Sequence, residues 1–476
     1  MTTLAIIGGG FTGAAVAYHL ARSPAGRRAQ IVVVEPREML GAGLAYSTRD
    51  PAHRINVPAD RMSLDTQDPD AFARWLRATG AIADDPDAVS ASGQAFPQRG
   101  LFGRYVADAL APFVASGRIV HRRTAAEAIA RRPGGTFDVA LADGVLHADL
   151  LVVATTHPPP AVPAALRALS GDPRFVVDPG EPGVLDAVSR DARVLVVGSG
   201  LTAADMVASL DRRGHRGPIL MLSRNGLRSR GHAPSAVEPF GDFTSAPART
   251  VRELTRNTRH AIDEAAAMGI SWHAVLDALR TGGPTIWSAL PEQERRQLVR
   301  RLRSFWDVHR FRIAPQVAAV LDRAQGEGRL RLVAASLVSS QPGHAGLTVA
   351  YRPRGGRAIE SRDFDIVVNT TGPAHRAVVE REPVRSLFEA GLIDLDRVGL
   401  GLHVDAEHRA LRRDGSVVPG LFIAGPLARG TFGELMGLPQ VTAHAELVAH
   451  ILGQQLEACE AADRPRMSGA RSRSGP

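Results

Sequence analysis

Glycines recur at close spacing in two places of the sequence, and each place could hold the pyrophosphate of a dinucleotide. The first is GGGFTG at residues 8–13, and the second is GSGLTA at residues 198–203. Glycines at this spacing let the backbone turn tightly and approach a pyrophosphate, whose charge then lies at a helix N-terminus. Two such turns predict two dinucleotide sites. The residues expected to line them are Gly8, Gly10, Phe11, Thr12 and Gly13 in the first turn, and Gly198, Gly200, Leu201 and Thr202 in the second.

The residue that ends the next apolar run predicts which dinucleotide each turn binds. Glu35 ends the run at 31–34, at a spacing where an acid hydrogen-bonds ribose hydroxyls. That suits FAD or NAD and repels a 2′-phosphate. The run at 219–222 ends instead in Ser223 and Arg224. An arginine there can pair with a 2′-phosphate, so NADPH is expected at the second turn, the alternative being an exposed arginine with no ligand.

Each turn lies between an apolar strand and a helix of small residues, as a dinucleotide-binding turn requires. Residues 4–7 and 194–197 precede the two turns, and Ala14 and Ala204 begin the helices that follow. Apolar strands introduced by aspartate recur later in each half, at 149–155 and 365–372. The chain therefore reads as two related nucleotide-binding halves. The expected fold class is α/β, with two Rossmann-like dinucleotide-binding domains and an inserted helical lobe.

The periodicity of the chain predicts how these parts are distributed. Residues 228–323, inside the second dinucleotide-binding domain, show helical periodicity over a length too great for an idle loop, so they are expected to shape a substrate pocket or lid. The C-terminal tail is rich in Arg, Ser, Gly and Pro and is expected to be disordered. The expected boundaries are 1–163 and 355–463 for the FAD-binding domain, 190–227 and 324–354 for the NADPH-binding domain, 228–323 for the helical insertion, and 464–476 for the tail.

Together these motifs resemble the flavoproteins with two dinucleotide-binding domains, in which FAD lies in the first domain and NAD(P)H in the second. Two further stretches, GAGLAYSTRDPAHRINVPADRMS at 41–63 and FWDVHRFRIAP at 305–315, resemble a bacterial FAD/NAD(P)-binding branch akin to N-hydroxylating flavin monooxygenases. The resemblance covers nearly the whole chain. In these flavoproteins an aspartate that contacts the FAD ribityl chain often follows the terminal strand, whereas here Pro426 follows Gly425.

The resemblance also implies cofactor contacts outside the glycine turns. Asn56 and Ser63 lie in the stretch expected to cover the flavin, and Arg99 begins a helix that similar flavoproteins place against FAD. The alternative for Arg99 is that it only caps its helix. Residues at the ends of the later apolar strands complete the expected cofactor set, namely Thr155, Thr371, Gly372 and Gly425.

Residue usage limits where electrons from the flavin could go. All 57 Lys and Arg residues are arginine, which excludes lysine Schiff-base chemistry, and the single Cys459 excludes a redox-active cysteine pair. Three outlets remain: oxygen, an organic hydride acceptor and a protein electron carrier. The resemblance favours oxygen, with a flavin hydroperoxide hydroxylating the nitrogen of a small amine or amino acid. The alternatives are an FAD-dependent NAD(P)H dehydrogenase, an electron-carrier reductase without oxygen insertion, and a redox-sensing protein that is not an enzyme.

Three closely spaced residues are the candidates for catalysis: Asp307, His309 and Arg310. The guanidinium could bind a substrate carboxylate, and the imidazole could shuttle a proton. The alternative is an internal salt-bridge cluster that joins the helical lobe to a sheet. The spacing of histidines and acids predicts no metal site.

Composition sets further expectations. The formal net charge is +8, but the arginines are spread along the chain and aromatic residues are only 5%, so nucleic-acid binding is not expected. No apolar run approaches the roughly 18 residues of a membrane helix. The first strand follows Met1 almost directly, so a cytoplasmic location is expected. The sequence carries no signal for the oligomeric state.

Overall fold

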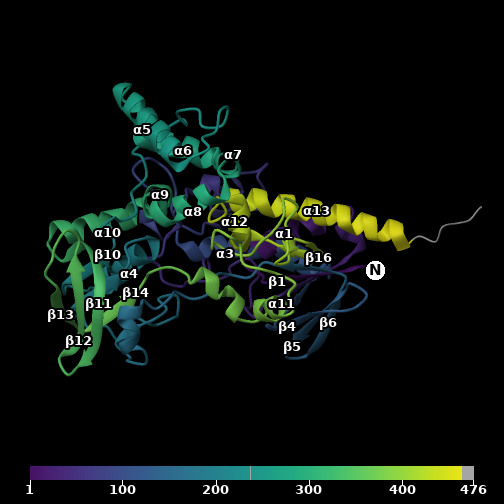
Figure 1. Cartoon of the computed structure of the whole chain (residues 1–476), viewed down its shortest axis with the longest axis horizontal. Helices are drawn as coiled ribbons and strands as arrows, with labels where there is room; N and C mark the ends of the chain where they lie inside the picture. Colours follow the sequence, from purple (N-terminus) through teal and green to yellow (C-terminus); the bar gives the residue numbers. More distant parts are fainter. Residues whose placement is uncertain (236, 464–476) are drawn as a thin grey trace, which may run out of the picture.

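Two sheets of mainly parallel strands organise the protein, whose computed structural model describes residues 1–235 and 237–463. The predicted disordered tail at 464–476 lies outside the described residues. In Figure 1 the two sheets stand side by side, with a group of helices above them. Each sheet is built around one of the two glycine turns, so the structure confirms the predicted α/β class with two dinucleotide-binding domains and a helical lobe.

The first sheet has the strand order β15-β16-β7-β1-β2-β3, and only the β15–β16 pair is antiparallel. Successive side chains of each strand point to opposite faces of the sheet, and each face has its own core. In β1, Leu4 and Ile6 face α1, α3 and α13, whereas Ala5 and Ile7 face a small meander and α11. Burial on both faces explains why these strands are continuous apolar runs. The elements are β1 (Thr3–Ile7), β2 (Gln30–Val34), β3 (Ile119–Arg122), β7 (Leu150–Val153), β15 (Arg409–Leu411), β16 (Val417–Ile423), α1 (Phe11–Arg22), α2 (Ala71–Thr79), α3 (Arg99–Ala115), α11 (Val384–Glu389), α12 (Arg429–Phe432) and α13 (Gln440–Asp463), with the meander β4 (Ala126–Arg131), β5 (Phe137–Leu141) and β6 (Gly144–Ala148).

The second sheet repeats this plan with the order β13-β12-β11-β10-β9-β14-β8. Strands β8, β14, β9, β10 and the start of β11 are parallel, and β11 then continues into an antiparallel meander with β12 and β13. Helices α4 and α10 pack together against one face. The elements are β8 (Phe175–Val176), β9 (Val194–Val197), β10 (Ile219–Ser223), β11 (Leu330–Gly343), β12 (Gly346–Pro353), β13 (Glu360–Phe364), β14 (Ile366–Asn369), α4 (Leu201–Arg212) and α10 (Pro315–Gly326).

The sheet pairing corrects two expected boundaries. Residues from 355 onward were expected in the first domain, but β14 pairs with β9, in register from Ile366 opposite Val194, and so belongs to the second sheet. The reason is that a buried apolar strand pairs beside the strand that leads into its own glycine turn, as β7 pairs with β1. Helix α10 was expected in the insertion, yet it packs on α4 as the crossover helix of the second domain.

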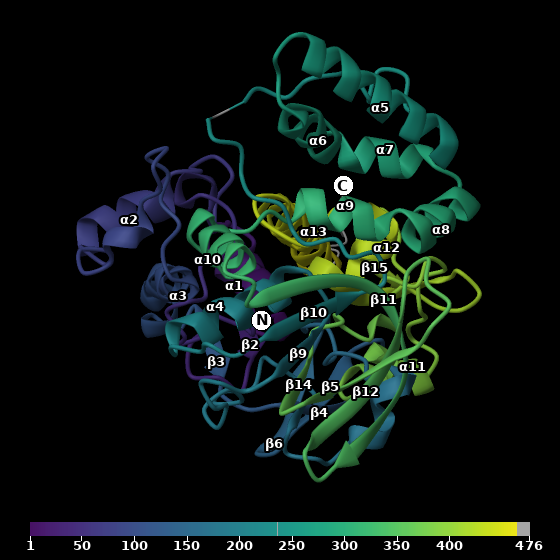
Figure 2. The ribbon, with the colours of Figure 1, turned by 90° about the vertical axis from the view of Figure 1, so that its left-hand side faces the viewer.

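The remaining inserted helices form a lobe around a small core of their own. Phe243, Val275 and Ile286 are among the side chains buried in that core. Figure 2 shows α5, α6 and α7 above the sheets, with α8 and α9 lying between. These helices are α5 (Val251–Ala267), α6 (Trp272–Thr281), α7 (Gly283–Ala289), α8 (Glu292–Arg301) and α9 (Arg303–Arg310). In the part of the chain that the structure describes, no helix has the length and apolar character needed to cross a membrane.

Candidate functional site

The first glycine turn is packed so closely that side chains would not fit. A Cβ atom on Gly13 would lie 1.9 Å from the carbonyl oxygen of Gly8, and one on Gly8 would lie 2.7 Å from the carbonyl oxygen of Ala154. Gly8 also has a φ of 101°, which favours glycine. Gly10 and Gly43 face each other, because a Cβ on Gly43 would lie 3.0 Å from Gly10 Cα. Two backbones free of side chains thus meet where a pyrophosphate would approach, and this fits a dinucleotide.

Glu35 lies at the end of β2, beside this turn, as predicted. Its carboxylate is 3% exposed and accepts a hydrogen bond from the amide of Gly9 at 2.9 Å. Arg37 pairs with the other carboxylate oxygen at 3.0 Å. The acid is therefore held in place at the first turn, and its contact with a ribose stays a prediction.

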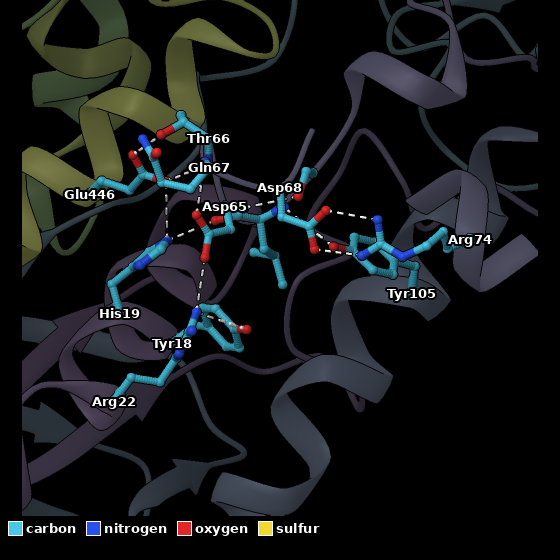
Figure 3. Close-up of polar contacts among 12 residues, drawn as sticks. Tyr18, His19, Arg22, Asp65, Thr66, Gln67, Asp68, Arg74, Tyr105 and Glu446 are labelled. Atoms are coloured by element: carbon cyan, nitrogen blue, oxygen red, sulfur yellow. Dashed lines mark hydrogen bonds and ion pairs between the residues drawn. The ribbon is translucent and has the colours of Figure 1, made fainter. Parts of the chain in front are cut away.

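The stretch at 41–63 folds over the first turn, and a polar cluster anchors its end. The amide of Gly41 donates to the carbonyl of Gly9 at 2.7 Å. Figure 3 shows the cluster that follows, in which Thr66 donates to Glu446 of α13 through its amide and its hydroxyl, each at 2.6 Å. Asp65 pairs with Arg22 of α1 at 3.0 Å. These contacts fix the covering stretch against the two helices beside the first sheet.

The two residues predicted in this stretch have different surroundings. Asn56 lines a pocket, and its carbonyl accepts a hydrogen bond from Nε2 of His232 at 3.1 Å. Ser63 is buried, and its hydroxyl accepts from the amide of Asp65 at 3.0 Å. The Ser63 side chain thus holds its own loop, whereas Asn56 faces space in which a ligand could lie.

Arg99 joins the two domains, and its predicted contact with FAD stays a prediction. Its guanidinium pairs with Asp205 of α4 through two nitrogens, at 2.9 and 3.1 Å, and donates to the carbonyl of Arg54. These contacts hold the guanidinium between the covering stretch and α4. The sequence signal for this pair is the acid at position 205, which interrupts a helix start of otherwise small and apolar residues. In the structure this acid is 8% exposed.

The second glycine turn is open where the first is covered. A Cβ on Gly200 would meet no atom within 4 Å, while one on Gly198 would lie 2.5 Å from the carbonyl oxygen of Thr370. Arg224 is exposed at the end of β10 and makes no ion pair with any described residue. A second guanidinium lies nearby, because Arg354 donates to the side chain of Asn225 at 3.0 Å. The geometry suits a phosphorylated ribose at this edge.

The four strand-end residues divide between the two turns. A Cβ on Gly425 would lie 2.6 Å from Thr12 Oγ1, and the buried hydroxyl of Thr155, beside Gly8, has no hydrogen-bond partner in the described chain. Thr371 and Gly372 instead follow β14 in the second sheet, where both bond to Ala161. The first pair therefore lies at the first glycine turn, and the second pair follows Thr370, which lies against Gly198 of the second turn.

The three catalytic candidates of α9 each have a different polar partner. Asp307 pairs with Arg303 at 3.2 Å, while Arg310 is buried and pairs with Glu434 at 2.8 Å. His309 donates through Nδ1 to the carbonyl of Phe305 in its own helix. Of the three, only Arg310 lines the pocket, and their catalytic role stays a prediction.

Asp307 belongs to an internal polar cluster, which was the alternative interpretation. Arg303 also donates to Nε2 of His375 at 3.0 Å, and the rings of His375 and His157 pack edge to face with centroids 4.8 Å apart. Burial lowers the pKa of His157 to about 4 and raises the pKa of Asp307. Arg429 adds a guanidinium that is 5% exposed. The cluster joins the lobe to loops of both domains.

A pocket lies between the covering stretch and the helical lobe. Its walls come from the stretch at 56–61, from residues 232, 233, 235 and 237, and from α6 and the end of α9. Sequence reasoning missed most of its polar side chains, which have no motif of their own. They are Arg61, Gln94, His232, Asp277 and Arg280, whereas Arg312 lies in the stretch at 305–315 that the sequence singled out. Among the described residues no group of histidines, cysteines or acids could hold a metal ion.

The fold and the first turn match known proteins. Residues 5–158 match a family described as FAD-NAD(P)-binding, which confirms the predicted dinucleotide-binding character of the first domain. A search of curated proteins finds no match.

Solved structures of similar fold cover almost the whole chain. The ornithine hydroxylase PvdA of Pseudomonas aeruginosa is 16% identical, with a TM-score of 0.64 over 96% of this chain and 99% of that one. The Kutzneria sp. 744 ornithine N-hydroxylase KtzI, solved with reduced FAD, NADP⁺ and L-ornithine, is 17% identical with the same score and coverage. DfoA of Erwinia amylovora, a cadaverine monooxygenase bound to FAD, is 15% identical with a TM-score of 0.61 over 95% of each chain. The predicted resemblance to N-hydroxylating flavin monooxygenases is thus confirmed for the fold.

Proposed function

We propose that this protein is a cytoplasmic FAD-dependent, NADPH-using monooxygenase that hydroxylates the nitrogen of a small amine or amino acid. The observation that carries the proposal is the placement of the pocket. It lies against the stretch that covers the first glycine turn, and the lobe walls it from the other side. A substrate there would lie next to a flavin held by the first domain, while the open second turn receives NADPH. The activities named for the three structural relatives support the same proposed activity.

Each domain has residues suited to one cofactor. In the first, Glu35 hydrogen-bonds a ribose and repels a 2′-phosphate, so FAD fits and NADPH does not. In the second, Arg224 pairs with the 2′-phosphate of NADPH. When bound and reduced, FAD supplies the electrons that activate oxygen.

The chain itself orients the substrate and excludes water. Helices α6 and α9 and residues 232, 233, 235 and 237 line the pocket, and shielding from water protects reactive species from hydrolysis. Burial lowers the pKa of His232 to about 4, so this imidazole stays neutral and donates to Asn56. His232 therefore presents no positive charge to the amine at neutral pH.

Substrate-dependent NADPH oxidation tests the proposal. The FAD-loaded protein is mixed in air with NADPH and with L-ornithine, L-lysine, cadaverine and other small amines in turn, and both NADPH consumption and product mass are followed. At least one amine should accelerate oxidation and gain one oxygen atom. NADPH consumption that depends on an added ferredoxin or dye, with no amine oxidised, would support the reductase alternative and contradict the proposal.

A further inference from the structure

The pocket between the covering stretch and the lobe carries an excess of positive charge. Four arginines line it, Arg61, Arg280, Arg310 and Arg312, together with a single carboxylate, Asp277. Asp277 holds Arg312 through two contacts of 2.8 and 3.1 Å. Glu434, from the loop before α13, holds Arg310 at 2.8 Å. Both of these acids are therefore used, and among the described residues no carboxylate pairs with the other two guanidinium groups, those of Arg61 and Arg280.

Arg280 is the more enclosed of these two. It lies at the end of α6, and its hydrogen bonds to described residues go to neutral acceptors, the carbonyl of Leu438 at 2.5 Å and the side-chain oxygen of Gln440 at 2.9 Å. Arg61, by contrast, is exposed. Burial, reinforced by the charge of Arg310, lowers the pKa of Arg280 to about 9, which still leaves it charged at neutral pH. A charge that is largely removed from water and lacks a counter-ion is costly, and an incoming anion would offset that cost.

The same charges oppose a cationic ligand. A diamine would bring two ammonium groups into a space already lined by unpaired guanidinium groups, and like charges at close range repel. The neutral His232 does not change this balance. A ligand with a carboxylate would meet the opposite situation, because an arginine binds a carboxylate through two parallel hydrogen bonds.

We infer that Arg280 binds the carboxylate of the substrate, so that the pocket selects carboxylate-bearing amines over diamines of the same length. The identification of the ligand as a substrate rests on the proposed function. Carboxylate binding at Arg280 does not, because it follows from the charges of the pocket alone. The inference also distinguishes between the substrates named for the structural relatives, because it favours an amino acid over a diamine such as cadaverine.

Calorimetric binding to the FAD-loaded protein, without NADPH, tests this inference. The probes are glutarate, 5-aminovalerate and cadaverine, which have the same chain length and differ in how many ends carry a carboxylate. Glutarate and 5-aminovalerate should bind more tightly than cadaverine. The Arg280→Gln variant should weaken binding of both carboxylates by about tenfold to a hundredfold, since one charge-assisted pairing is lost. Arg280→Lys, which keeps the charge, should lose less.

Arg259→Gln is the matched control, because it removes an exposed arginine of α5 in the same lobe. Its carboxylate binding should equal that of the wild type, and thermal unfolding of every variant checks that the lobe remains folded. Three results would overturn the inference: no binding of either carboxylate, binding of cadaverine as tight as theirs, or unchanged carboxylate binding in Arg280→Gln. Turnover plays no part in this experiment, so carboxylate binding without any amine oxidation would refute the proposed function and leave this inference standing.

Discussion

The Gly10→Val variant should fold but contain no bound flavin. Gly10 precedes α1 and faces Gly43, whose Cα would lie 3.4 Å from a Cβ at position 10. The two further methyl groups of valine would extend into the space between the turn and the covering stretch, where the backbone must approach the pyrophosphate. Flavin released by denaturing the purified protein and measured by absorbance should fall from near stoichiometric in the wild type to undetectable in the variant.

Gly134→Val is the control for this prediction. Gly134 lies in the surface turn between β4 and β5, and a Cβ there would meet no atom within 4 Å. It should keep its flavin, which would show that valine for glycine is harmful only at the turn. Yellow protein from Gly10→Val, with normal flavin content, would refute the assignment of the first site.

Loss of the arginine from the buried Arg310–Glu434 pair should lower the free energy of unfolding by about 3–5 kcal/mol. The two side chains are only 4% and 7% exposed, and Arg310→Met would leave the Glu434 carboxylate buried without its partner. Replacement of both residues by methionine removes that unpaired charge, so the double variant should be clearly more stable than the single variant. Urea unfolding followed by circular dichroism measures both.

The exposed pair of Arg296 and Glu292 on α8 provides the comparison. These side chains are 54% and 43% exposed at a separation of 2.8 Å. Arg296→Met should therefore cost less than about 1 kcal/mol. Two results would contradict this prediction. One is a loss of stability in Arg310→Met no larger than in Arg296→Met, and the other is a double variant less stable than Arg310→Met.

Local patterns predicted the parts of this fold that depend on neighbours in the sequence. Each glycine turn is set by an apolar strand before it and small residues after it, so its place could be predicted within a few residues. Glu35 and Arg224 were placed correctly at their strand ends for the same reason, since the end of a parallel strand lies at the ligand edge of the sheet. The lobe followed from the length and helical periodicity of the insertion.

Contacts between distant segments could not be predicted in this way. Arg99 is 106 residues from Asp205, and Arg310 is 124 residues from Glu434, so neither pairing leaves a local pattern. Close spacing within α9 did not predict the partners of the candidates, because successive residues of a helix point in different directions and separate Asp307 from His309. The position of Arg280 in the pocket could not be predicted from the sequence, because the pocket forms only when α6 packs against the loop before α13.

Anaerobic reduction of the bound flavin by NADPH tests the central claim, that one chain holds FAD and NADPH in communicating sites. The wild-type protein is mixed with NADPH or NADH in the absence of oxygen, and bleaching of the yellow flavin is followed over a range of concentrations. NADPH should bleach the flavin at lower concentration than NADH. The Arg224→Ala variant should require about tenfold to a hundredfold more NADPH, with little change for NADH, because it loses one charge-assisted pairing. A flavin that stays oxidised in the presence of NADPH would contradict the account.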